Sequence, residues 1–423
     1  MRVLLIPFGS HGDVHPLIWL GQALQKRGHQ ITLITLPTYQ PLADYHRFDF
    51  APIGSHEDYE ALVRNPALWH PTRSLATLFD GDRFARLTRE AFYRINDLNL
   101  PGGTVMVAGS LALSARVAQE KLQIPLATVH LQPISYPSLR DPSRYPGLTI
   151  RNWWPIWFRR LLFWIGNRII MDPLVGPAVN SLRQELDMPR IRQVFGPWRH
   201  SPQLILGMFP DWFATARDWP AHFHRVGFPL YDQSEQNDLP WDLRGFLDDG
   251  APPVIVSFGS AMRLGQPYFS AAITACQQLG LRCLVLTRGR EQLPTKLPPE
   301  TFHSDYAPFS QVFPRARLVI HHGGIGTVAQ CLAAAVPQLV MPLAFDQPDN
   351  AARLERLGVA RVLSPKNFQP ERIIPILQEF LSSRQIAMAC RMAQARFRET
   401  DPRDRSCQLI EGLLTPIEIP WSD

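Results

Sequence analysis

The feature that most constrains the fold of this 423-residue chain is a repeated strand, glycine-containing loop, helix and second strand. In the first copy, residues 3–6 and 31–36 are apolar runs, and residues 17–24 place leucines on one helical face. Short continuous apolar runs are typical of parallel strands buried on both faces. Pro16 stands where we expect this helix to start, and Gly28 where we expect it to stop. The segment predicts a βαβ unit.

The same order returns in the second half of the chain. A strand at residues 254–258, a helix that extends to 279 and a strand at 283–286 form the second unit. A strand at residues 318–320, a helix that extends to 335 and a strand at 339–341 form the third. Strands that alternate with helices predict parallel sheets with helices on both faces. We therefore expect an α/β fold of two Rossmann-like, doubly wound domains that face each other across a cleft at the carboxyl ends of their strands.

The domain boundary is expected near the polar stretch DQSEQND at residues 232–238, because the APP segment at 251–253 restarts the pattern. A chain of this length is also too long for one core. We predict an acceptor-binding domain over residues 1–235, a nucleotide-sugar-binding domain over 250–400, and a tail over 401–423 that returns to the first domain.

Composition narrows the partners and the compartment. The net charge of +6, from 43 basic and 37 acidic residues, suits an anionic ligand or an acidic membrane surface. It is too evenly spread to favour nucleic acid. The five cysteines have no metal-binding spacing and predict buried thiols in a reducing compartment. With no long apolar stretch and no signal-peptide cleavage site, we expect a cytoplasmic protein.

A glycine-rich loop, HGGIGT at residues 322–327, joins a predicted strand to a predicted helix. Glycines let a ligand approach the backbone, and the helix N-terminus offers free N–H groups to an anion. His322 can add a hydrogen bond to a phosphate oxygen. The loop therefore predicts phosphate binding, although tight packing of helix on strand would also require glycines.

The segment MPLAFDQPDN at residues 341–350 follows the next strand. Together with Tyr306 and the glycine loop, it resembles the signature of the nucleotide-sugar-dependent glycosyltransferases of family 1, the UDP-glycosyltransferase-like enzymes. These enzymes have two Rossmann domains, the GT-B fold. The signature covers residues 306–350, and the resemblance covers essentially the whole chain.

The resemblance implies a role for several residues. His322 would contact the donor diphosphate, Asp346 and Gln347 would hold sugar hydroxyls, and Tyr306 would replace the tryptophan that stacks on the base. The rest of the expected donor site comprises Gly12, Ser260, Ala307, Gly324, Ile325, Gly326 and Thr327. The donor is a co-substrate, so no separate cofactor is implied.

One position departs from the family pattern. A glutamate that usually lies three residues after Thr327 chelates the ribose hydroxyls, and here it is Gln330. A neutral amide binds a vicinal diol less strongly than a carboxylate does. A deoxyribose donor such as a dTDP-sugar is therefore one interpretation, and a UDP-sugar held by the amide is the other.

Glycosyl transfer with inversion needs a base for the acceptor hydroxyl. Many members of the family carry a histidine three residues before a proline, whereas this chain has Asp13 before Pro16. It resembles the aspartate-dependent branch, and the AGS segment at 108–110 lacks the carboxylate that would orient a histidine base. Asp13 could instead cap a helix, and His11 or His15 could be the base.

Asp80 and Asp82 form the DxD spacing that metal-dependent transferases use. They lie far from the donor signature, in a predicted helix–turn segment, so we expect them on the surface and infer no metal site.

Residues 152–164 are unusually rich in tryptophan and phenylalanine, with Arg159 and Arg160 inside and Arg151 and Arg168 beside them. This pattern suits an interfacial helix that contacts the inner membrane surface or admits a lipid-like acceptor. A core helix is the alternative.

Shorter stretches resemble the branch that contains the bacterial rhamnolipid rhamnosyltransferase and the sterol glucosyltransferases. They lie at residues 65–69, 198–203, 218–220 and 227–230. The resemblance implies an inverting, metal-independent hexosyltransferase that moves rhamnose from dTDP-L-rhamnose to a hydroxy fatty acid. A UDP-glucose enzyme acting on a sterol or another small aglycone is the alternative.

Other classes fit less well. A sugar-nucleotide epimerase needs further acids around the donor sugar. A dehydrogenase needs a G-x-G-x-x-G loop and an acidic residue after the second strand. The chain has Gly9-x-x-Gly12 and Thr35-Leu36 at these places. An inactive sugar-binding protein would be expected to lose Asp13 or His322.

Overall fold

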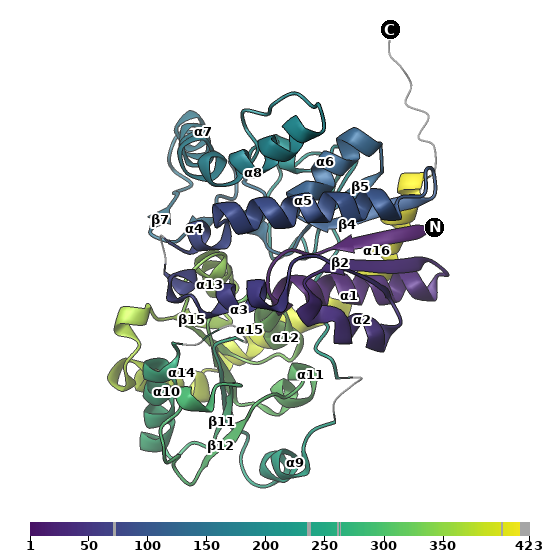
Figure 1. The fold of residues 1–423 in the computed structure, drawn as a ribbon. Coiled ribbons are helices and arrows are strands. Elements are labelled where there is room, and N and C mark those ends of the chain that lie inside the picture. Colours follow the sequence, from purple (N-terminus) through teal and green to yellow (C-terminus); the bar gives the residue numbers. More distant parts are fainter. Residues whose placement is uncertain (71–72, 235–237, 260–261, 263, 399–400, 415–423) are drawn as a thin grey trace.

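The computed structural model describes the chain except residues 71–72, 235–237, 260–261, 263, 399–400 and 415–423. Its two large sheets lie one above the other in Figure 1, with the first half of the chain in the upper part. Both are parallel and have helices on their two faces, as the sequence pattern predicts.

The first sheet has the strand order β3-β2-β1-β4-β5-β8-β9. Its strands are β1 (Arg2–Ile6), β2 (Gln30–Thr35), β3 (Asp49–Pro52), β4 (Thr104–Gly109), β5 (Leu126–His130), β8 (Leu204–Gly207) and β9 (Phe223–Arg225). A two-stranded antiparallel hairpin, β6 (Arg144–Tyr145) and β7 (Leu148–Thr149), lies outside it.

The second sheet has the order β12-β11-β10-β13-β14-β15. Its strands are β10 (Val254–Ser257), β11 (Cys283–Leu286), β12 (Thr301–Ser304), β13 (Leu318–His321), β14 (Gln338–Val340) and β15 (Ala360–Val362). All five cysteines are buried and free, as predicted.

Alternating side chains explain why both faces of each sheet are covered. Val3 and Leu5 of β1 pack into one core cluster, and Leu4 and Ile6 pack into another on the opposite face. Because neighbouring residues of a strand point to opposite faces, a continuous apolar run requires helices on both sides.

The helices of the first half are α1 (His11–Lys26), α2 (Gln40–His46), α3 (His56–Arg64), α4 (Ser74–Leu78), α5 (Gly81–Leu98), α6 (Leu113–Leu122), α7 (Ile156–Ile165) and α8 (Asp172–Glu185). Those that follow are α9 (Trp241–Asp248), α10 (Gln266–Gln278), α11 (Phe309–Val312), α12 (Ile325–Ala333), α13 (Gln347–Arg356), α14 (Pro370–Ser382), α15 (Arg384–Ala395) and α16 (Pro402–Glu411). No helix in the described part of the chain is both long and apolar enough to cross a bilayer.

Helix α16 lies beside α1 of the first half, at the right of Figure 1. Glu411 of α16 accepts from Arg27 at 2.7 Å and lies 2.7 Å from His29 Nε2. Apolar residues of both halves also share one core cluster, in which Phe213 and Phe228 lie with strand residues of the second sheet. The two halves are therefore packed together through α16 and through this shared cluster.

The prediction that the first helix starts at Pro16 is wrong, because α1 begins at His11. Ser10 is its N-cap and forms a capping box with Asp13. This reciprocal pair satisfies N–H groups that the helix itself leaves free. Pro16 lies inside the helix and has no N–H to donate to the Gly12 carbonyl.

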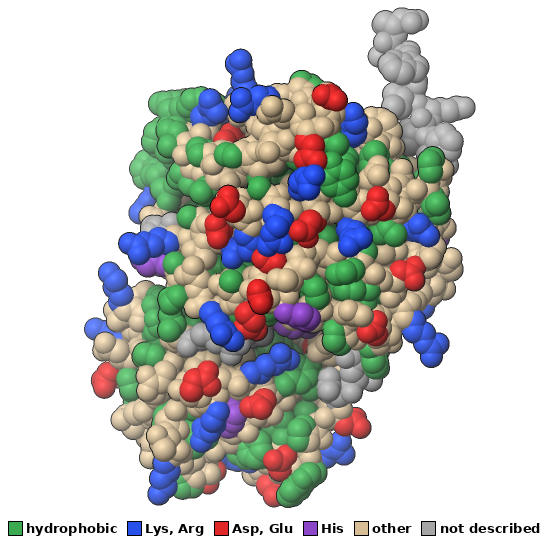
Figure 2. Space-filling model, in the orientation of Figure 1, with side chains coloured by type: hydrophobic (Ala, Val, Ile, Leu, Met, Phe, Trp, Pro, Cys, Tyr) green, Lys and Arg blue, Asp and Glu red, His purple; other side chains and the backbone are tan. Residues whose placement is uncertain are grey.

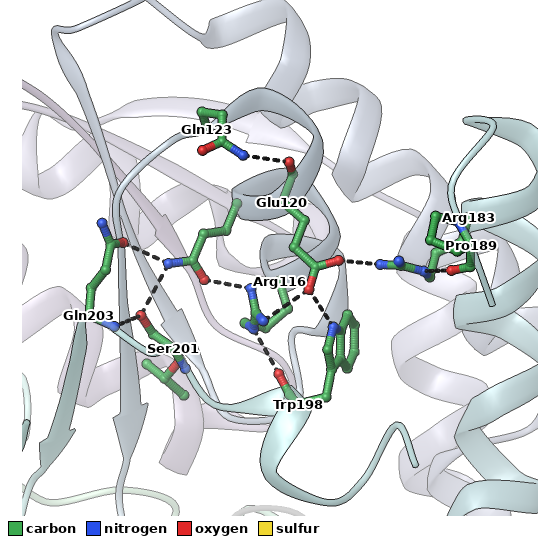
Figure 3. A network of polar contacts seen from close by, with 10 residues as sticks. Arg116, Glu120, Gln123, Arg183, Pro189, Trp198, Ser201 and Gln203 are labelled. Carbon is green, nitrogen blue, oxygen red and sulfur yellow. Dashed lines mark hydrogen bonds and ion pairs between the residues drawn. The ribbon is translucent and has the colours of Figure 1, made fainter. Parts of the chain in front are cut away.

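Residues 198–203, one of the stretches that resemble the rhamnosyltransferase and sterol glucosyltransferase branch, belong to a structural network (Figure 3). Glu120 of α6 accepts from Trp198 Nε1 at 2.6 Å and also pairs with Arg116 and Arg183. Ser201 donates to the Leu126 carbonyl at 2.6 Å. The network fixes α6 and the entry to β8, away from the cleft.

Candidate active site

A cavity of about 410 Å³ lies between the two halves. Its walls include the loops that follow β1 in the first half and β11, β12, β13 and β14 in the second. The strand order reverses between β1 and β4 and between β10 and β13, which is where doubly wound sheets bind ligands.

The predicted phosphate loop lines this cavity. Gly324 is the N-cap of α12, and the next three residues, Ile325, Gly326 and Thr327, also face the cavity. The first N–H groups of a helix have no partner within it, and the helix dipole places partial positive charge there. This end of α12 can therefore bind an anion such as a diphosphate.

His322 lies between two glycines that leave room for its ring. A Cβ at Gly324 would lie 2.6 Å from His322 Nε2, and a Cβ at Gly259 would lie 2.9 Å from Cε1. Burial lowers the pKa of His322 to about 4, so the imidazole is neutral near pH 7. Nδ1 is buried without a partner among the described residues, so the ring keeps hydrogen-bonding capacity in the cavity.

Asp346 and Gln347 begin α13 and line the same cavity. Asp346 Oδ2 accepts from Asn350 Nδ2 at 2.6 Å, and the same amide nitrogen donates to the Gly323 carbonyl at 2.9 Å. Gln347 Oε1 accepts from the backbone N–H of Leu343 at 2.7 Å. The NH₂ group of Gln347 therefore remains free to donate a hydrogen bond to a ligand, and the carboxylate oxygens of Asp346 can accept hydrogen bonds from it.

Asp13 reaches the cavity from the opposite half, in the first turn of α1 rather than in a loop as predicted. Oδ2 accepts from the Ser10 N–H at 2.8 Å, so the alternative of a capping residue also holds. A Cβ at Gly9, whose φ is +132°, would lie 2.2 Å from Oδ2, so only glycine fits this approach. Oδ1 has no hydrogen bond to the described residues. Burial raises the pKa of Asp13 to about 6.

Known proteins are similar to this chain in sequence and in fold. Residues 283–411 match the family described as Erythromycin biosynthesis protein CIII-like, C-terminal domain. The chain is 28% identical over 383 residues to the O-mycaminosyltylonolide 6-deoxyallosyltransferase of Streptomyces fradiae, covering 85% of each chain. It is 26% identical over 423 residues to the sterol 3-beta-glucosyltransferase of Pichia angusta, with 94% of this chain but only 32% of that longer protein covered.

Solved structures share the fold over nearly the full length. The kitacinnamycin glycosyltransferase has a TM-score of 0.76 at 21% identity, covering 98% of this chain and 99% of that one. The spinosyn rhamnosyltransferase SpnG, complexed with thymidine diphosphate, has a TM-score of 0.66 at 20% identity, covering 97% and 100%. The chain has the GT-B fold and is similar over most of its length to family 1 glycosyltransferases. It transfers a sugar from a nucleotide sugar.

His11 and His15, the alternative bases, also line the cavity of this glycosyltransferase. Their rings lie 5.4 Å apart, and His11 Nδ1 is 3.4 Å from the Tyr59 hydroxyl. Burial, with help from the charge of Arg288, lowers the pKa of His11 to about 4 and that of His15 to about 3. Both imidazoles are therefore much weaker bases than the Asp13 carboxylate.

The remaining predicted donor residues gather in the same place. Gly12, Tyr306, Ala307 and Gln330 line the cavity, whereas Ser260 lies outside the described residues. The Tyr306 hydroxyl donates to the backbone carbonyl of Asp232, in the segment that joins the halves. This bond holds the ring at the rim of the donor half of the glycosyltransferase.

Among the cavity residues that were not predicted, Trp69 and Arg288 stand out. Trp69 comes from the first half, yet its ring lies 6.4 Å from the His322 ring and 6.4 Å from the Phe345 ring. Arg288 follows β11 and is charged enough and near enough to lower the pKa of both histidines on α1. An arginine just after a strand of the second half was the available signal for Arg288. Trp69 ends one of the stretches that resemble the rhamnosyltransferase and sterol glucosyltransferase branch, but that resemblance does not indicate a contact with His322.

Asp80 and Asp82 lie apart from this site. They are exposed and line a second cavity, between α5 and α8. In the part of the chain that the structure describes, no group of three or more His, Cys, Asp or Glu side chains is arranged to hold a metal ion.

Proposed function

We propose that this glycosyltransferase transfers its sugar with inversion, using Asp13 as the base and no metal ion, to the hydroxyl of a lipid-like acceptor. One observation carries the proposal: Asp13 lines the same cavity as His322, the N-terminus of α12 and the Asp346–Gln347 pair. A base from one half thus faces groups suited to a sugar diphosphate on the other.

In this reaction the acceptor oxygen bonds to the anomeric carbon while its proton passes to Asp13. The bond from that carbon to the diphosphate breaks, and the electron pair leaves with the diphosphate. The helix N-terminus, His322 and Arg288 supply hydrogen bonds and positive charge where negative charge develops. Asp346 and the NH₂ group of Gln347 would hold sugar hydroxyls.

The pKa values favour Asp13 over the two histidines. A general base works best when its pKa lies near the working pH. The pKa of Asp13 is raised to about 6, whereas that of His11 is lowered to about 4 and that of His15 to about 3. The carboxylate is ionised at pH 7 and is the strongest base of the three.

Replacing Asp13 with asparagine tests the base. The amide oxygen of the new side chain can still accept from the Ser10 N–H, so α1 should keep its cap, and removal of a buried charge should leave the melting temperature unchanged or higher. We expect kcat to fall by about 100-fold or more, with donor affinity unchanged by thermal shift. Normal turnover of Asp13→Asn together with an inactive His15→Ala or His11→Ala would assign the base to a histidine.

For the donor we propose dTDP-L-rhamnose. Gln330 lines the cavity, at the sequence position where the family resemblance places a carboxylate that binds ribose hydroxyls. The spinosyn rhamnosyltransferase of the same fold binds thymidine diphosphate, which supports a deoxyribose donor. UDP-glucose remains the alternative, supported by the similarity to a sterol 3-beta-glucosyltransferase.

A thermal-shift comparison of dTDP with UDP tests this choice. A ligand at about 100 times its Kd adds about 2.7 kcal/mol of stability, so the tighter nucleotide gives the larger shift at equal concentration. We expect dTDP to stabilise the wild type more, and Gln330→Glu to move the preference toward UDP. A larger shift with UDP and turnover of UDP-glucose with a sterol would refute the rhamnosyl donor.

The acceptor is proposed to be apolar, such as a hydroxy fatty acid. The first half contributes many apolar side chains to the cavity wall, among them Phe8, Leu62, Val63, Leu68, Leu78, Leu111, Leu131 and Met208. Such a wall gains free energy by burying alkyl chains. Because an acceptor of this kind partitions into membranes, peripheral contact with a membrane surface belongs to the same proposal.

A further inference from the structure

The aromatic segment around α7 is a surface feature. Trp153 is 75% exposed, Trp157 is 68% exposed and Ile169 is 65% exposed. The alternative of a core helix is therefore wrong. In Figure 2, hydrophobic side chains gather at the upper left, over the end of the molecule where Figure 1 labels α7.

We define the α7 surface as Trp153, Ile156, Trp157, Leu161, Trp164, Ile169 and Ile170, all of which are exposed. They lie on α7, the loop before it and the π-helical turn (Gly166–Met171) after it. Neighbouring large apolar residues on a soluble domain mark a place where another apolar phase is contacted.

Charge indicates the nature of that phase. From residue 142 to residue 171 the chain has no aspartate, glutamate or lysine, but it has Arg144, Arg151, Arg159, Arg160 and Arg168. Arg151, Arg160 and Arg168 are exposed beside the tryptophans. Tryptophan seats at the boundary between headgroups and acyl chains, and arginine is attracted by anionic headgroups.

The inner side of α7 is held in place. Arg159 is buried and donates to the Leu139 carbonyl. Phe163 contacts Tyr145 of the β6–β7 hairpin with ring centres 6.3 Å apart. The hairpin also bonds to the donor half, through the Arg144 N–H to Asp349 Oδ1 at 2.9 Å. The outward side chains are thus presented by an anchored helix next to the seam between the halves.

We propose that the α7 surface docks this glycosyltransferase on an anionic lipid bilayer. The purpose of docking, access to a lipid-like acceptor, rests on the proposed function, but the docking itself does not. The helix would lie in the plane of the interface, with the tryptophans and isoleucines among the upper acyl chains and the arginines at the headgroups.

Co-sedimentation of the full chain with vesicles tests the proposal. We expect binding to phosphatidylcholine vesicles that contain phosphatidylglycerol to be about tenfold or more tighter than binding to pure phosphatidylcholine, and to weaken with salt. The combined variant Trp153→Ser, Trp157→Ser and Ile169→Ser should lose binding. Arg160→Gln with Arg168→Gln should lose the preference for phosphatidylglycerol.

Matched controls lie on the other half of the molecule. Trp241 is 87% exposed on α9, so Trp241→Ser should bind like the wild type. Lys366→Gln with Arg372→Gln removes two exposed charges and should also leave binding unchanged. All variants should keep the wild-type melting temperature and the wild-type rate on a short-chain, water-soluble acceptor.

Absence of vesicle binding by the wild type, or equal binding by the α7-surface and Trp241 variants, would overturn the proposal. If the α7-surface variant loses self-association but not vesicle binding, the surface contacts a second copy of the chain, and the docking proposal is overturned as well. Vesicle binding without transfer to any lipid-like alcohol would leave docking intact and refute the proposed acceptor.

Discussion

At the scale of single residues, two carboxylates face one cavity from opposite halves. Burial raises the pKa of Asp13 to about 6, and burial raises that of Asp346 to about 7, to which the charge of Asp13 adds. An Asp346 that is protonated near pH 7 can donate as well as accept hydrogen bonds. These environments suit the two proposed roles, Asp13 as the base and Asp346 as a partner for sugar hydroxyls.

The pH dependence of kcat/KM should follow the raised pKa of Asp13. The base must be ionised, so activity is lost as pH falls through about 6, rather than near 4 as for an ordinary aspartate. A profile from pH 4 to 9 at constant ionic strength measures this midpoint. An activity that stays constant down to about pH 4.5 would contradict an Asp13 base with this pKa.

At the scale of elements, α13 connects three parts of the site. Its first turn carries the sugar-binding candidates, and Asn350 ties it to the glycine loop. Arg353, buried with 2% of its side chain exposed, pairs with Asp349 at 2.8 Å and with Asp141 of the other half at 2.7 Å. Burial alone would raise the pKa of Asp141, yet Arg353 and Arg356 hold it below its usual value.

Arg353→Met should lower the free energy of unfolding by about 3–5 kcal/mol, because it removes the buried guanidinium that pairs with two buried carboxylates. Arg356→Met is the matched control: that arginine pairs with the same Asp141 but is 53% exposed, so its loss should cost less than about 1 kcal/mol. Urea denaturation measures both. Equal effects would show that the buried pair does not hold α13 in place.

A double variant tests whether the loss of stability in Arg353→Met comes from an unpaired buried charge or from lost packing. Asp141→Leu combined with Arg353→Met removes one carboxylate together with the guanidinium and should be more stable than Arg353→Met alone. It should still show a raised KM for the nucleotide sugar, because α13 has lost the ion pair that joins it to the first half. An unchanged KM would restrict the pair to a structural role.

At the scale of the whole molecule, the order of strands and helices was predictable from the sequence. Short continuous apolar runs such as residues 254–258 and 283–286 are typical of strands buried on both faces, so the strands could be located from the local sequence. The start of α1 was misplaced by five residues, at Pro16 instead of His11. Proline is common in a first turn, but the Ser10–Asp13 capping box extends the helix toward the strand, which weighs more than the proline preference.

Most of the predicted site residues line one cavity, since loops after parallel strands meet at one edge of a sheet. What the sequence could not indicate are contacts between distant segments. Trp69 reaches His322, and Asp141 pairs with Arg353 although 212 positions separate them. Such contacts depend on how the two halves pack, and no local pattern encodes that packing.

The sequence by itself determined the alternating α/β pattern, the glycine loop and the residue types of the site, because these depend on local hydrogen bonding and on chemistry that each residue carries with it. Tertiary structure alone decided which groups lose water and which keep it. Burial raises the pKa of Asp13 and keeps His322 neutral, and exposure turns the tryptophans of α7 from a candidate core into a surface. Solvation is a property of the packed molecule, since it is set by neighbours that are distant in the chain.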